Sequence, residues 1–157
     1  MPGSWLCKTE PDVYSIDDLR RDGVTGWEGV RNYQARNFMR DGMASGDRVL
    51  VYHSNAEPPG VAGIAEVVGD AIPDPTQFDA RSEYHDPKST RAAPRWVMRR
   101  LRFVDRFARL VSLDELRADP AAATMLALRP GNRLSVTPVT DAEFRAVRRL
   151  AERASRR

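Results

Sequence analysis

Two apolar segments joined by a short loop constrain the fold of this 157-residue chain more than any other feature. Asp47–His53 and Val61–Val68 each have the length and the apolar residues of a buried strand. Glu57–Gly60, which contains two consecutive prolines, is typical of a turn between them. Parallel neighbours would need a crossover of about a dozen residues or more. The two strands are therefore predicted to pair antiparallel, which argues against a doubly wound α/β fold.

The rest of the pattern predicts a single α+β domain over residues 1–157. Further strands are expected at Ser4–Lys8, Trp96–Val104 and Leu134–Val139. Helices are expected after Ser15, over Asn32–Arg40, after Ser112, over Ala121–Leu128 and over about 141–156. We expect a small mixed, mainly antiparallel β-barrel flanked by these short helices. The longest irregular segment, 70–94, is a candidate functional loop, because long loops in compact domains are often functional.

Composition places the chain among globular proteins. Hydrophobic residues make up 41% and charged residues 30%, which indicates a packed core rather than disorder. No apolar run approaches the roughly 20 residues that span a bilayer, and the first residues lack the pattern of a signal peptide. The single cysteine, Cys7, excludes an internal disulfide and fits a reducing compartment. We expect a cytoplasmic protein, with nucleoid association as an option, no membrane contact, and an oligomeric state compatible with a monomer.

Positive charge is concentrated in two stretches. Residues 1–140 contain 19 basic and 19 acidic residues, so the net charge of +3 lies in 141–157. A second local excess runs from Arg91 to Arg109, with seven arginines and one acid. Arginine suits contacts with phosphate, although a genome rich in G and C would also encode many arginines. The distribution modestly favours an anionic partner.

The sequence offers little support for catalysis or metal binding. His53 and Ser54 are adjacent, so within a strand their side chains would point to opposite faces. Cys7 lies in an apolar strand, which indicates a core residue. His53 and His85 are the two histidines, and no zinc-binding spacing or glycine-rich phosphate loop occurs. We therefore predict no catalytic residue, no metal and no cofactor.

Trp27–Gln34 and Tyr52–Asn55 concentrate the residue types that bind a nucleobase. The first segment combines two aromatic residues, two amides, a carboxylate and a guanidinium, and the second ends a predicted strand with polar side chains. Aromatic faces stack on a base for about 1–3 kcal/mol, and amides and hydroxyls pair with its edges. Structural roles are the alternative: Trp27 as a core residue, Asn32 as a helix N-cap, and Ser54 with its neighbour as turn residues.

Six ordered segments resemble the EVE-domain family. They cover the chain from Trp5 to about Arg153 and are, in order, Trp5–Pro11, Trp27–Asn37, Tyr52–Asn55, Asp86–Ser89, Pro94–Trp96 and Asn132–Val139. The resemblance implies a PUA-like fold, related to the YTH and ASCH domains. It also implies binding of a modified base, above all a modified cytosine in DNA such as 5-methylcytosine or 5-hydroxymethylcytosine, with RNA as the other option. Thr9 stands where the family often has serine, which leaves the pocket dimensions there open.

Residue types and resemblance together assign a nucleobase pocket that binds without catalysis. Trp27 would be the stacking platform and Trp96 a second wall. The edge of the base would be contacted by Asn32, Tyr33, Gln34, Ser54 and Asn55, and the opposite side would be closed by Ser135 and Pro138. The pocket rim or the phosphates would be contacted by Lys8, Thr9, Arg31, Arg36, His53, Arg100 and Arg102.

An enzyme is the main alternative. ASCH-like relatives include amidohydrolases of acylated cytidine that use Lys, Thr and Glu, and Lys8, Thr9 and Glu66 could supply this set. Lys8 and Thr9 are adjacent, so in a strand they would face opposite sides, which disfavours this interpretation. A third hypothesis is a structural domain that docks a protein partner, and it predicts no base-dependent affinity.

Overall fold

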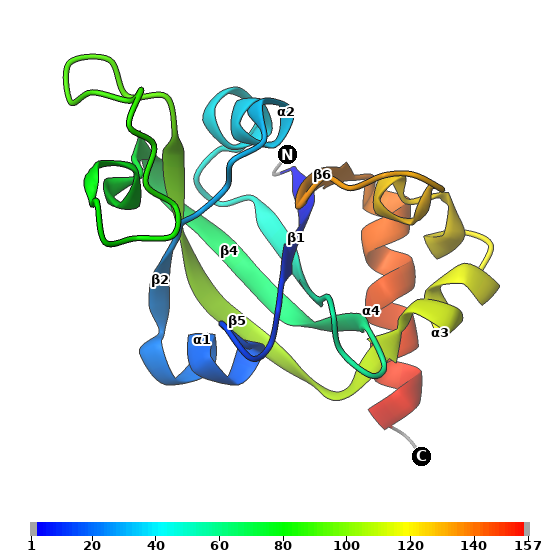
Figure 1. The fold of residues 1–157 in the computed structure, drawn as a ribbon. Helices are drawn as coiled ribbons and strands as arrows, with labels where there is room; N and C mark the ends of the chain where they lie inside the picture. Colours follow the sequence, from blue (N-terminus) through cyan, green and yellow to red (C-terminus); the bar gives the residue numbers. More distant parts are fainter. Residues whose placement is uncertain (1–2, 156–157) are drawn as a thin grey trace.

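The computed structural model describes residues 3–155. Within that range, six strands form one mixed sheet in the order β2-β5-β4-β3-β1-β6 (Figure 1). The strands are β1 (Ser4–Thr9), β2 (Val24–Trp27), β3 (Arg48–His53), β4 (Gly60–Pro73), β5 (Val97–Ser112) and β6 (Val136–Val139). The α-helices are α1 (Ile16–Asp22), α2 (Tyr33–Asn37), α3 (Leu113–Ala118) and α4 (Asp141–Ser155). The last residue of the predicted C-terminal helix, 156, lies outside the described residues, as do 1, 2 and 157.

The sheet confirms the predicted α+β class. β3 and β4 pair antiparallel across the predicted turn, with Arg48 opposite Glu66 and His53 opposite Gly60. β1 and β3 form the parallel pair, and the remaining neighbours are antiparallel. β2 and β6 are the two edges, so the described sheet is open and is not hydrogen-bonded into a closed barrel.

Both faces of the central strands are buried. Trp5 and Cys7 of β1 face a cluster that also contains α1, while Leu6 faces a second cluster under α4. In β3, successive residues likewise divide between the two clusters. A strand that is covered on both sides reads as a continuous apolar run, which explains the weak alternation of Asp47–His53. In the described part of the chain, no helix is long and apolar enough to cross a membrane.

Helix starts follow the predicted capping residues. The Ser15 and Ser112 side chains each accept a bond from the backbone of the third helical residue, whose carboxylate bonds back to the cap. The Asn32 side chain accepts from the Ala35 N–H and starts α2, as the alternative interpretation expects.

Several predicted elements differ in length or type. β4 continues to Pro73, into the segment 70–94 that was predicted to be irregular, and β6 begins at Val136. β5 continues to Ser112 because it pairs with β4 along most of its length, whereas the local pattern indicates an end near Val104. The predicted helix over Asn32–Arg40 is a short α2 followed by a π-helical turn, and Ala121–Leu128 forms two separate 3₁₀ turns. β2 is absent from the sequence prediction, because it is only four residues long and contains a glycine.

The segment between β4 and β5 is irregular but tightly organised around one buried amide. The Gln77 side chain donates to the carbonyls of Asp74 and Trp96, at 2.7 and 2.8 Å. Its oxygen accepts bonds from the Ser89 hydroxyl and from the backbone N–H groups of Arg95 and Trp96. These bonds replace the missing regular pairing, since buried polar groups need partners. The segment projects beside β2 (Figure 1).

Candidate functional site

An open cavity of about 690 Å³ lies where the end of β1, the end of β2 and the segment between β4 and β5 meet. This volume falls within the range of pockets that bind small molecules. Its lining residues are Lys8, Thr9, Glu10, Val13, Tyr14, Thr25, Gly26, Trp27, Glu28, Gly29, Val30, Ser54, Glu83, Tyr84, Arg133 and Ser135.

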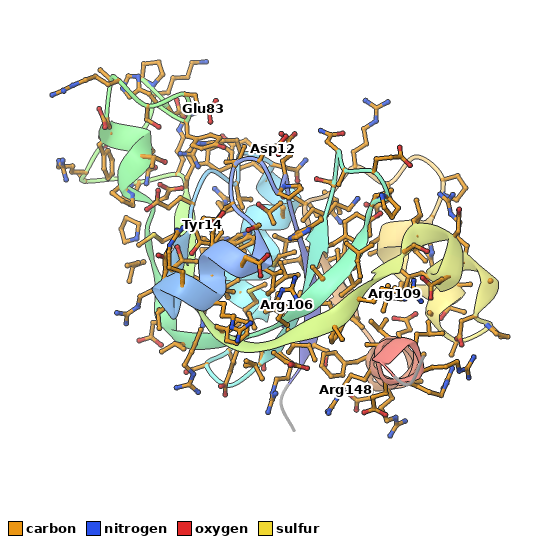
Figure 2. The ribbon with its side chains drawn as sticks, turned by 90° about the horizontal axis from the view of Figure 1, so that it is seen from below. Asp12, Tyr14, Glu83, Arg106, Arg109 and Arg148 are labelled. Atoms are coloured by element: carbon orange, nitrogen blue, oxygen red, sulfur yellow. The ribbon has the colours of Figure 1, made fainter. Side chains whose placement is uncertain are left out.

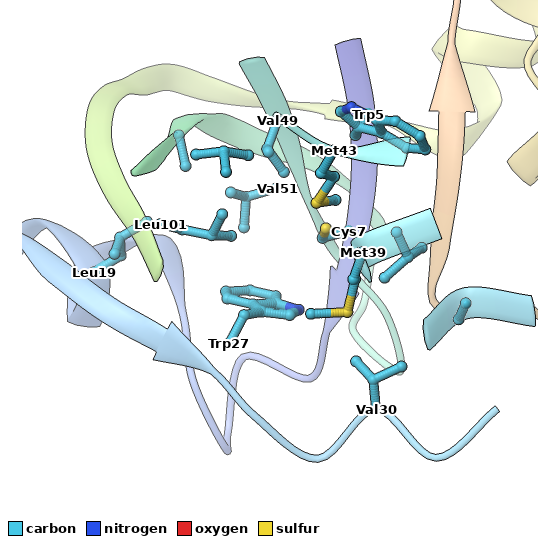
Figure 3. Close-up of a cluster of buried hydrophobic side chains, with 14 of the residues drawn as sticks. Trp5, Cys7, Leu19, Trp27, Val30, Met39, Met43, Val49, Val51 and Leu101 are labelled. Carbon is cyan, nitrogen blue, oxygen red and sulfur yellow. The ribbon is translucent and has the colours of Figure 1, made fainter. Parts of the chain in front are cut away.

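Trp27 serves both the core and the cavity. Its side chain is 8% exposed and belongs to the cluster that contains Cys7 and Met39, as Figure 3 shows. The ring also meets Tyr14 edge-to-face, with the ring centroids 6.3 Å apart. Trp27 therefore lines the cavity, as predicted, and also packs in the core, as the alternative interpretation expects. A rigid indole that is anchored on its inner side suits a fixed stacking surface.

Tyr84 supplies a second aromatic ring to the cavity, from the segment between β4 and β5. The ring lies against Gly29, whose positive φ of +83° favours glycine. Burial is the main reason that the pKa of the Tyr84 hydroxyl is raised, and the hydrogen bond and charge of Glu83 add to it. Figure 2 shows Tyr14 beside α1 and Glu83 on the segment that carries Tyr84.

Arg31 ties this segment to the residues that follow β2. Its Nε and one Nη donate to the Tyr84 carbonyl at 2.9 and 2.7 Å, and the other Nη donates to the buried Asp74 carboxylate. The same carboxylate accepts from the Gly29 N–H at 2.8 Å. Asp74 is fully buried, so it fixes Gly29 and Arg31 in one arrangement. Arg31 therefore acts through the position of Tyr84.

The ends of β1 and β3 form the polar side of the cavity. The Ser54 N–H donates to the Thr9 carbonyl, and the Lys8 N–H donates to the Ser135 carbonyl. Lys8 and Thr9 both line the cavity, although adjacent strand residues were expected to face opposite sides. Thr9 is the last residue of β1, where the chain turns, and its hydroxyl donates to the Tyr14 carbonyl.

Charge around the cavity is mixed. Lys8 and Arg133 are its cations, and burial lowers the pKa of the Lys8 ammonium. Glu10, Glu28 and Glu83 are its carboxylates. Burial is the largest cause that raises the pKa of Glu28; Asp74 adds to it and Arg31 opposes it.

Trp96 and Tyr33, both predicted to contact the base, form a separate stack. Their ring centroids are 4.8 Å apart and their planes differ by 24°. The Trp96 Nε1 donates to Asp86, and the Arg36 guanidinium covers the Tyr33 ring and donates to the Arg95 carbonyl. None of the three predicted residues Trp96, Tyr33 and Arg36 lines the described cavity.

Four further predicted residues also lie outside the cavity lining. Asn32 caps α2 and Gln34 is exposed on it. The Asn55 amide donates to Glu10 at 2.6 Å, beside the cavity. Pro138 pairs with Trp5, three residues along β1 from Lys8. Ser54 and Ser135, by contrast, are brought together with Trp27.

The predicted phosphate contacts are dispersed. The Ile16 N–H donates to His53 Nε2, so that nitrogen is occupied as an acceptor. Arg102 forms an ion pair with Glu66 on β4, and Arg100 is exposed on the same face of β5. Arg99, within the basic stretch, is buried and donates to the carbonyls of Met39, Met43 and Gly69. The Arg99 guanidinium therefore stabilises the fold and is not exposed for a contact with phosphate.

The residues of the predicted enzyme set do not assemble. Glu66 pairs with Arg48 at one end of β3, whereas Lys8 pairs with Tyr52 near the other end. Glu66 is also absent from the cavity lining. Burial raises the pKa of the Cys7 thiol to about 12, so it stays protonated, as expected of a core cysteine.

Sequence reasoning missed Tyr14, Glu28, Tyr84 and Arg133 as cavity residues. Glu28 carried a signal, because it lies inside the aromatic and amide segment that the sequence singles out. For Tyr84, the only signal in the sequence was its position in the longest irregular segment. The Arg31 bonds that bring it to the cavity span 53 positions, so no local pattern reports them.

Comparison with known proteins identifies similar chains. The family model described as the EVE domain matches residues 4–150. Human thymocyte nuclear protein 1 is 38% identical over 167 residues, covering 95% of this chain and 74% of that protein. A hypothetical protein from Leishmania major has a similar structure, with a TM-score of 0.95, 44% identity and coverage of 99% of this chain and 98% of that chain.

One similar structure contains DNA. The crystal structure of human THYN1 in complex with DNA containing 5-methylcytosine matches with a TM-score of 0.88 and 37% identity, covering 96% of this chain and 98% of that chain. An ASCH protein from Zymomonas mobilis matches with a TM-score of 0.53 and 13% identity, which is a likeness of fold alone.

Proposed function

Because the chain belongs to the EVE domain family, we propose that it is a DNA-binding module whose cavity accepts one modified cytosine, without chemical conversion of the base. The DNA-bound human relative supports a modified-cytosine ligand. The observation that carries the proposal is a single cavity lined by both aromatic rings and hydrogen-bonding groups.

The lining supplies the interactions that base recognition needs. Trp27 and Tyr84 offer aromatic faces, and the Ser54 and Ser135 hydroxyls offer donors and acceptors for the base edge. The Thr9 hydroxyl donates to the Tyr14 carbonyl and so offers the base an acceptor only. A buried polar site also discriminates, because a ligand that lacks a partner leaves polar groups unpaired. The cavity mouth is open, so a base extruded from the duplex has a path into it. Extrusion costs a few kcal/mol, least for a base that is already unpaired.

Lys8 and Arg133 are the cations that we assign to the backbone of the bound strand. Both line the cavity, and neither forms an ion pair with a side chain among residues 3–155. Phosphate would give them the anionic partner that the fold does not provide. Arg31 supports the cavity from behind, through Tyr84.

Titration of matched oligonucleotides at one fixed salt concentration tests the proposal. The strands differ at one position, which is cytosine, 5-methylcytosine or 5-hydroxymethylcytosine, and are used both as DNA and as RNA. We expect tighter binding of the modified DNA by tenfold or more, which corresponds to about 1.4 kcal/mol. Equal affinity for all bases would contradict the proposal, and stronger binding of the RNA series would reassign the nucleic acid.

A parallel incubation tests the enzyme alternative. Acetylated cytidine, supplied in excess over the protein, should remain intact. Release of cytidine beyond one equivalent would show turnover and would contradict binding without chemistry.

A further inference from the structure

Glu28 is a cavity-lining carboxylate that has no protein partner in the described part of the chain. Among the three carboxylates of the lining, Glu10 accepts a bond from the Asn55 amide at 2.6 Å, and Glu83 interacts with the Tyr84 hydroxyl. Within residues 3–155, Glu28 has neither a hydrogen-bond partner nor an ion-pair partner.

The side chain of Glu28 folds back along β2 toward Gly26. Its Oε1 lies 3.6 Å from the position that a Cβ on Gly26 would occupy. Gly26 itself lines the cavity, and it has no side chain to fill the space beside the carboxylate. Glu28 and Trp27 thus belong to the lining of one cavity, so a base that stacks on Trp27 would come near the carboxylate.

A carboxylate in a site that binds nucleic acid is electrostatically unfavourable. Phosphates repel it, and Asp74, Glu10 and Glu83 are further negative charges around it, offset by Arg31, Lys8 and Arg133. A ligand with an exposed N–H donor reverses this cost, because the donor gives the carboxylate a partner as it is desolvated. Cytosine presents such a donor at N4, where thymine presents only the O4 acceptor.

We propose that the Glu28 carboxyl group accepts a hydrogen bond from the N4 amino group of the bound cytosine and thereby selects amino-pyrimidines over keto-pyrimidines. This inference rests on the proposed function of the cavity. Partial desolvation is the main cause that raises the pKa of Glu28, as expected of a carboxyl group at the wall of a cavity. This bond would lie on the edge that distinguishes cytosine from thymine.

The test compares 5-methylcytosine with thymine at one position of a single-stranded DNA oligonucleotide. The two bases share the 5-methyl group and differ at N3 and C4, and a single strand removes the cost of extrusion. We expect the wild-type protein to prefer 5-methylcytosine by about tenfold or more, since one good base-edge pair is worth about 1–3 kcal/mol.

Glu28→Gln should abolish this preference or invert it. The glutamine amide can donate to O4 and accept from N3–H of thymine, so the ratio of the two affinities should fall to about one or below. Glu57→Gln is the matched control: it removes the same charge from an exposed residue outside the cavity lining and should keep the wild-type ratio. Glu28 forms no hydrogen bond and no ion pair within residues 3–155 and is only partly desolvated, so thermal melting should be unchanged by its substitution.

The possible results separate the inference from the function on which it rests. If wild-type protein distinguishes 5-methylcytosine from cytosine but Glu28→Gln keeps the wild-type preference over thymine, the Glu28 inference is overturned and the proposed function stands. If the wild-type protein binds 5-methylcytosine and thymine equally, the inference is overturned in the same way. If the wild-type protein distinguishes no base at all, the proposed function is overturned, and the Glu28 inference is overturned with it.

Discussion

The ring of Tyr84 lies so close to Gly29 that a Cβ added to the glycine would meet Tyr84 Cζ at 2.7 Å. The two residues belong to segments far apart in the chain, and their contact closes one side of the cavity. Position 29 therefore requires glycine for two reasons: its φ is positive, and a side chain there would collide with the aromatic ring.

Gly29→Ala should displace Tyr84 and weaken base-dependent binding by tenfold or more. The alanine also has to adopt a positive φ, which costs about 1–2 kcal/mol of stability. Titration with the 5-methylcytosine oligonucleotide measures the first effect, and thermal melting measures the second.

Gly46→Ala provides the control for backbone strain. Gly46 has a φ of +96° and nothing within 4 Å of its missing Cβ, and it precedes the end of β3 that is remote from the cavity. It should lose similar stability and keep full affinity. If both variants bind equally well, the contact between Gly29 and Tyr84 does not shape the ligand site.

Arg31→Lys should loosen the segment between β4 and β5 while the sheet stays folded. A lysine cannot reproduce the two bonds to the Tyr84 carbonyl together with the bonds to Asp74 and Thr76. Leaving buried partners unsatisfied costs about 1–3 kcal/mol. Hydrogen exchange should accelerate around Tyr84 and remain slow in β3, with affinity reduced for every modified base. If hydrogen exchange around Tyr84 is unchanged, Arg31 does not position Tyr84.

Lys8→Gln and Arg133→Gln should weaken binding of all bases alike. If each cation contacts one phosphate, each variant lowers the slope of log affinity against log salt by about 0.7 on single strands. The preference for 5-methylcytosine over cytosine should persist.

Arg102→Gln is the comparison for this pair, because Arg102 is paired with Glu66 and lies outside the cavity lining. A larger change of salt slope in Arg102→Gln than in the two cavity variants would place the DNA backbone along β5.

His53 should make stability depend on pH. Burial is the main cause that lowers its pKa below the ordinary 6.5, and Asp17 opposes the shift. Between the folded pKa and 6.5, the unfolded chain binds more protons, so acid favours unfolding. The contribution of His53 to the free energy of unfolding is therefore complete above pH 6.5 and is lost as the pH falls from 6.5 through the folded pKa.

His53→Gln removes this titration but keeps an acceptor for the Ile16 N–H. The difference in melting temperature between wild type and variant should therefore change between pH 7.5 and 5.5, with the wild type losing more on acidification. A pH-independent difference would show that the folded and unfolded pKa values of His53 are equal.

Features that depend on neighbours in the chain could be predicted from the sequence. The antiparallel pairing of β3 and β4 follows from the short loop that joins them, and the helix starts at Ser15 and Ser112 follow from their capping boxes. The resemblance to the EVE domain family is likewise a property of ordered short segments, and it correctly indicates the α+β, PUA-like fold. Trp27 and Ser54 were identified by residue type, and both line the cavity.

Only the tertiary structure decided which aromatic and charged residues share a cavity with Trp27. Trp96 has the same residue type, yet it stacks on Tyr33, while Tyr84 reaches the cavity through bonds to Arg31 that span 53 positions. β2 exists because β5 offers it a partner, since four residues that include a glycine are too few to show a strand pattern of their own. The sequence determined local pairing, caps and family because those depend on nearby residues, whereas the cavity depends on long-range packing around the buried Asp74 carboxylate.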